Sequence, residues 1–194
     1  LSIKQGLPQA LQLAFADSEI RWQHNNNQHS FALNEGQLLF SNLAEFDQLT
    51  INSNDLLFNT NSDDWSPINL QFKKDNANLF AYVSEVNLST ISTLLPLFNA
   101  EPTLINAFDT MALTGSAEQL YFQSSDDKYQ FSAEFSTLSN NFYKGLPGLN
   151  NAAGDVLFDT SQLQINLTAS HGALNFDKHF VLPIPYNELV ADVV

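Results

Sequence analysis

Apolar and polar residues alternate along most of this chain, and a period of two predicts β-strands. Phe131, Ala133 and Phe135 alternate with polar neighbours, and the pattern resumes after the Gly-Leu-Pro-Gly-Leu turn sequence at 145–149. Alternation places the large apolar side chains on one face of a sheet. Such a face has to be covered by a second sheet, by a helix or by a hydrocarbon ligand.

The N-terminal part shows the same period in shorter stretches. Leu11, Leu13 and Phe15 alternate, and we expect Ile20 and Trp22 to extend the pattern on a second strand. The polar run 24–29 predicts a hairpin loop, with Phe31 and Leu33 opening the returning strand. Further strands are predicted around 38–40, 49–51, 57–58, 68–72 and 79–83.

The pattern changes to helical spacing after Asn87. Ser89 is the predicted cap of a helix from Thr90 to Phe98, whose regular part Pro96 shortens. A second helix is expected to start at 101–103 (Glu-Pro-Thr). We therefore predict a mainly β fold for residues 1–194, taken as one fragment of a larger protein. The predicted fold is a curved antiparallel sheet, as a groove or a half-open barrel or sandwich, with a helical insertion near 89–110.

Three glycines share a short repeated pattern. Gly36, Gly154 and Gly172 are each followed by an apolar residue two positions later and a phenylalanine four positions later. The pattern is consistent with a repeated way of entering a strand from a turn, or with a sheet built from similar hairpins.

Composition excludes several classes of function. The chain of 194 residues has 16 Phe but only 7 Lys plus Arg, and its net charge is −14. Phe has no polar group, so its rings are expected to point into a dry space. The negative charge argues against nucleic-acid binding. The lack of cysteine excludes disulfides and thiolate chemistry, and no apolar run approaches membrane-spanning length.

No motif for catalysis or metal binding stands out. The four histidines, His24, His29, His171 and His179, show no metal-ligand spacing. The acidic pairs at 63–64 and 126–127 are better explained by turns than by calcium binding. Hydrolase, phosphate-loop and dinucleotide motifs are missing. We expect no enzymatic activity, no cofactor and no metal.

The second half of the chain resembles the YhdP branch of the AsmA-like proteins, over about 68–190. The resemblance rests on the order of segments of low chemical specificity, namely 86–89 (Val-Asn-Leu-Ser), 94–98 (Leu-Leu-Pro-Leu-Phe), 131–135 (Phe-Ser-Ala-Glu-Phe), the turn 145–149, 172–176 (Gly-Ala-Leu-Asn-Phe) and 183–185 (Pro-Ile-Pro).

The resemblance implies an inner-membrane-anchored protein that extends through the periplasm as a bridge-like lipid transfer protein. Phospholipid acyl chains would then be the ligand of the apolar face, and adjacent segments of the same longer chain would be its neighbours. The predicted lipid-binding residues are Phe31, Leu33, Leu49, Ile51, Leu70, Phe72, Phe131, Phe135, Ile165, Leu167 and Phe176.

Two other functions remain open at this point. The same residues can form an ordinary core in a structural or protein-binding β module, which would associate through end strands near Leu11 and Phe180. An acidic carbohydrate-binding sandwich would instead need exposed aromatic platforms, for which Trp22, Trp65 and a few Tyr are the candidates.

Overall fold

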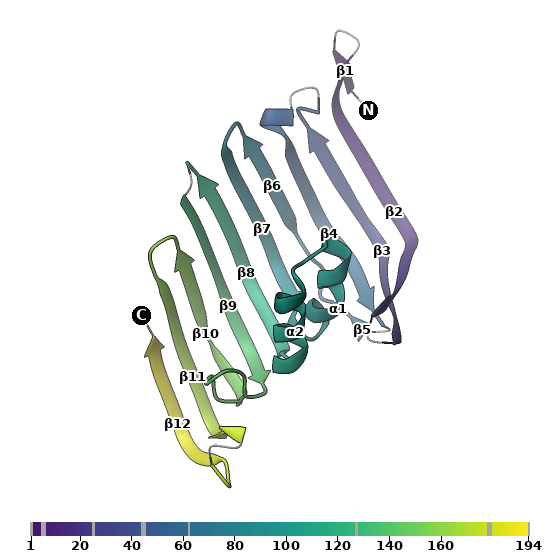
Figure 1. Ribbon diagram of the computed structural model, residues 1–194. Helices are drawn as coiled ribbons and strands as arrows, with labels where there is room; N and C mark the ends of the chain where they lie inside the picture. Colours follow the sequence, from purple (N-terminus) through teal and green to yellow (C-terminus); the bar gives the residue numbers. More distant parts are fainter. Residues whose placement is uncertain are drawn as a thin grey trace. The chain divides into compact units, whose positions relative to one another are not determined.

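The protein is built on one antiparallel β-sheet, as predicted. The computed structural model describes residues 2–4, 7–24, 26–43, 46–61, 63–126, 128–177 and 180–193. Its 12 strands follow the order β1-β2-β3-β4-β6-β7-β8-β9-β10-β11-β12, with the short β5 paired to β4 (Figure 1). Over the described residues the sheet is not closed into a barrel.

The strands are longer than the alternating stretches in the sequence suggest. They are β1 (Ser2–Lys4), β2 (Leu7–His24), β3 (Asn27–Ser41), β4 (Thr50–Thr60), β5 (Asp63–Asp64), β6 (Leu70–Asp75), β7 (Asn78–Asn87), β8 (Thr114–Ser125), β9 (Lys128–Asn140), β10 (Leu149–Asp159), β11 (Leu163–Leu174) and β12 (Ile184–Val193). A 3-10 turn, η1 (Phe46–Gln48), precedes β4.

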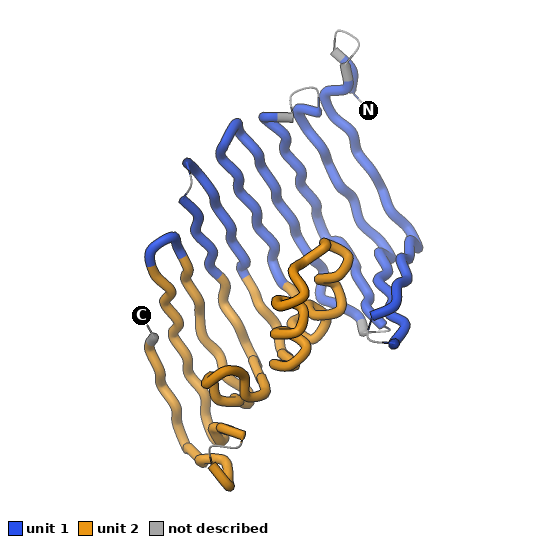
Figure 2. Tube along the Cα trace, in the orientation of Figure 1, with its two compact units in different colours: residues 1–85, 119–132, 159–161 blue, residues 86–118, 133–158, 162–194 orange. Residues whose placement is uncertain are grey.

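The chain divides into two compact units (Figure 2). Unit 1 comprises residues 1–85, 119–132 and 159–161, and unit 2 comprises 86–118, 133–158 and 162–194. The described part of unit 1 contains strands of the one sheet and the single turn η1, so this unit supplies no second layer of its own.

The helical insertion lies in unit 2 and occupies the predicted part of the sequence, near 89–110. It consists of η2 (Leu88–Thr90), α1 (Ile91–Leu94), η3 (Leu95–Phe98) and α2 (Pro102–Met111). The predicted cap at Ser89 is wrong, because the insertion already begins at Leu88. The Asn87 side chain accepts hydrogen bonds from the Ser89 N–H at 3.0 Å and the Ser89 hydroxyl at 2.7 Å instead.

In several strands the alternation of apolar and polar positions shifts by one residue, and we call each such shift a step. Asp17 in β2 and Asp55 in β4 have positive φ values of 50° and 49°, a region that Asp and Asn tolerate better than most residues. In β3, the pairing with β4 shifts register on both sides of Glu35. Apolar residues are therefore at even positions in one half of a strand and at odd positions in the other, yet on the same face.

The step at Asp17 corrects one strand prediction. Ile20 and Trp22 are not on a second strand, because β2 continues through Asp17 to His24. The polar run predicted as a hairpin loop is mostly strand as well, since β3 already starts at Asn27. Residue 25 lies outside the described residues.

The three repeated glycines lie within strands, not at the entrances from turns. A Cβ added at Gly36 would meet the Leu56 side chain, and one at Gly172 would meet the Tyr186 side chain. At Gly154 it would clash with the Asn166 backbone oxygen and lie 3.1 Å from the Phe135 ring. Each glycine thus permits the close approach of a neighbouring strand.

The proline-glycine turn is held by Asn140 at the end of β9. Its side-chain amide donates to the Pro147 carbonyl at 3.1 Å, and its side-chain oxygen accepts from the Leu149 N–H at 3.3 Å. Leu149 forms a small buried cluster with Ala152 and Ala169. The residue that ends the turn therefore lies in the core of unit 2.

Candidate functional site

Unit 1 presents one apolar and one polar face of the same five strands. Successive Cα partners form the apolar row Leu11–Phe40–Ile51–Phe72–Ala81 across β2, β3, β4, β6 and β7. The next row on the other side of the sheet is Gln12–Leu39–Asn52–Gln71–Tyr82. Paired residues of an antiparallel sheet share a face, so the contrast between these rows defines the two faces.

The apolar face continues past the steps in alternation. Leu33 pairs with Phe58, and Leu56 pairs with Ile68, which brings the outer halves of β3 and β4 onto the same face as Leu70. We define the apolar face of unit 1 by the residues Leu11, Leu13, Phe15, Ile20, Phe31, Leu33, Leu38, Phe40, Ile51, Leu56, Phe58, Ile68, Leu70, Phe72, Ala81 and Val83.

Most large side chains of this face are not buried as in a protein core, and the exceptions are Leu56 and Ile68. Among the described residues, the buried hydrophobic side chains are few, and four of them are alanines: Leu56, Ile68, Ala117, Ala133, Leu149, Ala152 and Ala169. None is a phenylalanine. The phenylalanine rings of this face are half-buried, and Ile20 is 58% exposed.

Aromatic rings gather at the end of this face next to the β2–β3 hairpin. The rings of Phe31 and Phe58 lie 4.7 Å apart, and that of Trp65 meets both edge-on, at 6.5 and 6.2 Å between centroids. Trp22 stacks on His29, its Cα partner, at 5.7 Å. Both tryptophans of the chain belong to this group of five rings, which we call the aromatic end.

Two buried polar atoms border the aromatic end. Thr60 pairs with Phe31 and is 0% exposed. Among the described residues, its hydroxyl and the Nε1–H of Trp65 have no hydrogen-bond partner. Buried polar groups in proteins are nearly always satisfied, so this pair is unusual in the fold.

Asn61 is hydrogen-bonded to both Ser30 and His29. The Asn61 side-chain oxygen accepts from the Ser30 N–H at 2.8 Å, which turns its amide nitrogen toward His29 Nδ1 at 3.1 Å. An amide NH₂ only donates, so Nδ1 is the acceptor and the ring proton is on Nε2. In this arrangement the Nε2–H of His29 is available as a donor.

Unit 2 has an apolar face of its own on β10, β11 and β12. Its rows are Ala152–Ala169–Leu189, Gly154–Leu167–Ala191 and Val156–Ile165. Leu138, Leu167, Leu174, Tyr186 and Leu189 pack against its buried cluster. Asn151 and His171, with φ values of 55° and 52°, step the alternation here as Asp17 and Asp55 do in unit 1.

The structure places all eleven predicted lipid-binding residues at half-buried positions. In unit 1, Leu49 precedes β4 and Phe131 lies in β9, while the other five residues lie on the apolar face defined above. In unit 2, Ile165 and Leu167 lie on the apolar rows, and Phe135 lies against Gly154. Phe176 follows β11 and its ring is 5.3 Å from that of the exposed Phe180.

Sequence reasoning missed several residues of the face of unit 1. The alternation of Leu11, Leu13, Phe15, Leu38 and Phe40 was visible, but nothing in it showed that these even and odd positions share a face with Phe31. The aromatic end brings together Trp22, Phe58 and Trp65, which are far apart in the sequence. The aspartates at 17 and 55 are the signal that could have indicated the steps.

Two exposed ion pairs lie in the described part of unit 1. Arg21, the sole arginine, donates two hydrogen bonds to Glu19, at 2.9 and 2.8 Å. Arg21 is next to Trp22 on β2 and therefore lies on the opposite face of the sheet. The hydrogen bond from Arg21 lowers the pKa of Glu19, and the bond to Glu19 raises the pKa of Arg21. Lys74 and Asp47 form an exposed ion pair at 3.2 Å.

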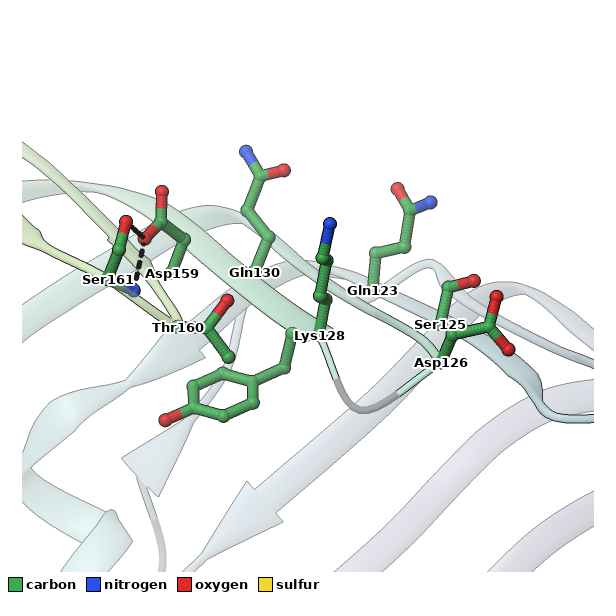
Figure 3. A pocket seen from close by; sticks show the side chains of 9 residues that line it. Gln123, Ser125, Asp126, Lys128, Gln130, Asp159, Thr160 and Ser161 are labelled. Carbon is green, nitrogen blue, oxygen red and sulfur yellow. Dashed lines mark hydrogen bonds between the residues drawn. The ribbon is translucent and has the colours of Figure 1, made fainter.

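A hollow of about 710 Å³ in unit 1 has a polar lining (Figure 3). Lys128, Asp126 and Asp159 contribute charges, with amides and hydroxyls between them. The Asp159 carboxylate accepts from the N–H and the hydroxyl of Ser161, both at 2.7 Å. The residues that line this hollow are polar or charged in type, in contrast to those of the apolar face of unit 1.

The described residues contain no group of three or more His, Asp or Glu side chains that could hold a metal ion. No described helix combines the length and the apolar character that crossing a bilayer requires.

A family model matches the whole chain. Neither the curated proteins nor the solved structures include a significant match to the chain. The family model described as "YhdP protein" matches residues 1–194, which extends the resemblance beyond 68–190 to the whole sequence. The chain belongs to the YhdP family.

Proposed function

We propose that this chain is a segment of an envelope conduit, in which phospholipid acyl chains lie on the apolar face during transport between inner and outer membranes. Membership of the YhdP family suggests a lipid-transport-related envelope protein. The observation that carries the finer proposal is the row Leu11–Phe40–Ile51–Phe72–Ala81, which is apolar across five strands of a unit whose described part contains no second layer of its own.

Hydrocarbon burial supplies the binding energy without specific polar contacts. It contributes about 0.8 kcal/mol for each CH₂ group removed from water. A face of Leu, Ile and Phe side chains therefore holds an acyl chain along its length and still lets it slide. We propose no enzymatic activity and no cofactor for this segment.

The location of the segment is part of the same proposal. We place it in the periplasm, within an inner-membrane-anchored protein whose adjacent segments continue on either side. Its few basic residues would give anionic headgroups little to bind, which favours movement over retention.

Photo-crosslinking in cells tests this proposal directly. A photoreactive amino acid at Leu38, Ile51 or Phe72 is expected to yield phospholipid adducts, detected by mass spectrometry of the purified protein. Leu39, Asn52 and Gln71 are matched controls, because each follows or precedes a test position on the same strand and lies on the opposite face. The controls are expected to yield no adducts above background.

Equal labelling of the two sets would contradict a lipid track on this face. A lack of adducts at all six positions would favour the second candidate, a protein-interaction module. One observation supports that alternative: Val181 and Leu182, beside the outermost strand β12, are 100% and 75% exposed. Exposed apolar side chains next to an unpaired strand edge are typical of association sites.

A further inference from the structure

We propose that the aromatic end of unit 1 binds the ester-linked glycerol segment of a lipid whose acyl chains lie on the apolar face. This inference rests on the proposed function and goes beyond it, since it assigns where on the face a bound lipid lies and in which direction its acyl chains run. It starts from the hydroxyl of Thr60 and the indole Nε1–H of Trp65, which are buried and unpartnered among the described residues.

The polarity of the face changes in steps toward the β2–β3 hairpin. The row Ser18–Leu33–Phe58 is followed by Ile20–Phe31–Thr60 and then by Trp22–His29. Leu, Ile and Phe side chains dominate the face up to Phe31, and the last row before the hairpin carries indole and imidazole instead. Tryptophan favours sites that are apolar at one end and polar at the other, as at the boundary between hydrocarbon and headgroups.

The groups at this end suit a neutral acceptor. Trp65 Nε1–H and His29 Nε2–H are donors, and the Thr60 hydroxyl can donate as well. A phosphate would favour cations, but Arg21 is the one Lys or Arg between residues 7 and 72. It lies in the row of the opposite face and is paired with Glu19. An ester carbonyl accepts hydrogen bonds without needing a cation.

Access requires a side-chain movement at Trp65. Its Nε1 atom is covered, whereas the residue as a whole is half-buried. Rotation of the indole, which meets Phe31 and Phe58 only edge-on, presents the N–H to a carbonyl lying on the face. The hydrogen bond formed would offset the cost of leaving that donor unsatisfied.

Lipids with and without the ester carbonyls test the inference. The probes are a diester phosphatidylethanolamine and the diether lipid with the same headgroup and chain length, each displacing a fluorescent fatty acid from the purified protein. We expect the diester lipid to bind roughly three- to tenfold more tightly, the effect of one hydrogen bond. The Thr60→Val/Trp65→Phe variant should lose this preference and bind the two lipids with equal affinity.

Tyr121→Phe is the control variant. It removes a hydroxyl that donates to Gln119, from a ring that lies next to the ring of Tyr82 on the polar face. The ester preference should therefore persist. Equal binding of both lipids to the wild-type protein would overturn the inference while leaving the proposed function intact. Binding of neither lipid would overturn both. The wild-type comparison is decisive even where the double variant fails to fold.

Discussion

Replacing Thr60 by Val is expected to stabilise the lipid-free protein, contrary to the usual effect of a core substitution. Thr60 is 0% exposed and its hydroxyl has no partner among the described residues. Folding therefore removes water from this hydroxyl without replacing the lost hydrogen bonds, which destabilises the folded state. Val has the same shape and branching and a higher preference for strands. Leaving a buried hydroxyl unsatisfied costs about 1–3 kcal/mol, of which we expect about 1–2 kcal/mol to be recovered.

Thr90 provides a matched control of the opposite sign. It is also buried, at 4% exposure, but its hydroxyl donates to the Asn87 carbonyl at 2.9 Å. Thr90→Val removes that bond and leaves the carbonyl without its hydroxyl donor. The expected effect is a loss of about 1–2 kcal/mol.

Urea unfolding of the two variants and the wild type, followed by circular dichroism, measures both effects. The free energy of unfolding should rise for Thr60→Val and fall for Thr90→Val, with unchanged slopes against urea concentration. A destabilised Thr60→Val protein would refute the reasoning, because it would show that the hydroxyl is satisfied in solution. A change of slope would instead indicate an altered unfolded state or a third state.

Two further predictions concern single contacts. Gly154→Ala should destabilise unit 2 by about 1–3 kcal/mol, because the new Cβ meets the backbone oxygen of Asn166, which cannot yield as a side chain does; unchanged urea unfolding would contradict the close approach. Arg21→Gln should raise the pKa of the Glu19 carboxyl toward its ordinary value, since the hydrogen bond from Arg21 lowers it in the wild type. Carboxyl NMR titration measures this shift. The Glu19–Arg21 pair should therefore be lost as pH falls through the lowered pKa, and identical titrations in both proteins would argue against the pair in solution.

The sequence pattern predicted the strands and the helical insertion better than it predicted the faces. Alternation is a local property of the sequence. Phe131 and Ile165 lie within strands as expected, and Leu70 is the first residue of β6. Which alternating stretches share a face depends on the steps at residues such as Asp17 and Asp55. One step inverts every side chain beyond it, and a positive φ inside a strand leaves little signal in the sequence.

The aromatic end was beyond sequence reasoning for a different reason. Trp65 comes from the segment between β5 and β6, and it meets Phe31 and Phe58 only because β4 pairs with β3 in one particular register. The cap at Asn87 shows the same limit on a smaller scale, since either Asn87 or Ser89 suits the position by residue type.

The steps in alternation also constrain how this chain can change in length during evolution. Deleting Asp17 alone would turn Ile20 and Trp22 to the polar face while their partners Phe31 and His29 stayed in place. A single insertion or deletion in one strand would thus break the continuity of the apolar surface. We expect length differences among relatives to fall in the turns, or to occur in neighbouring strands together.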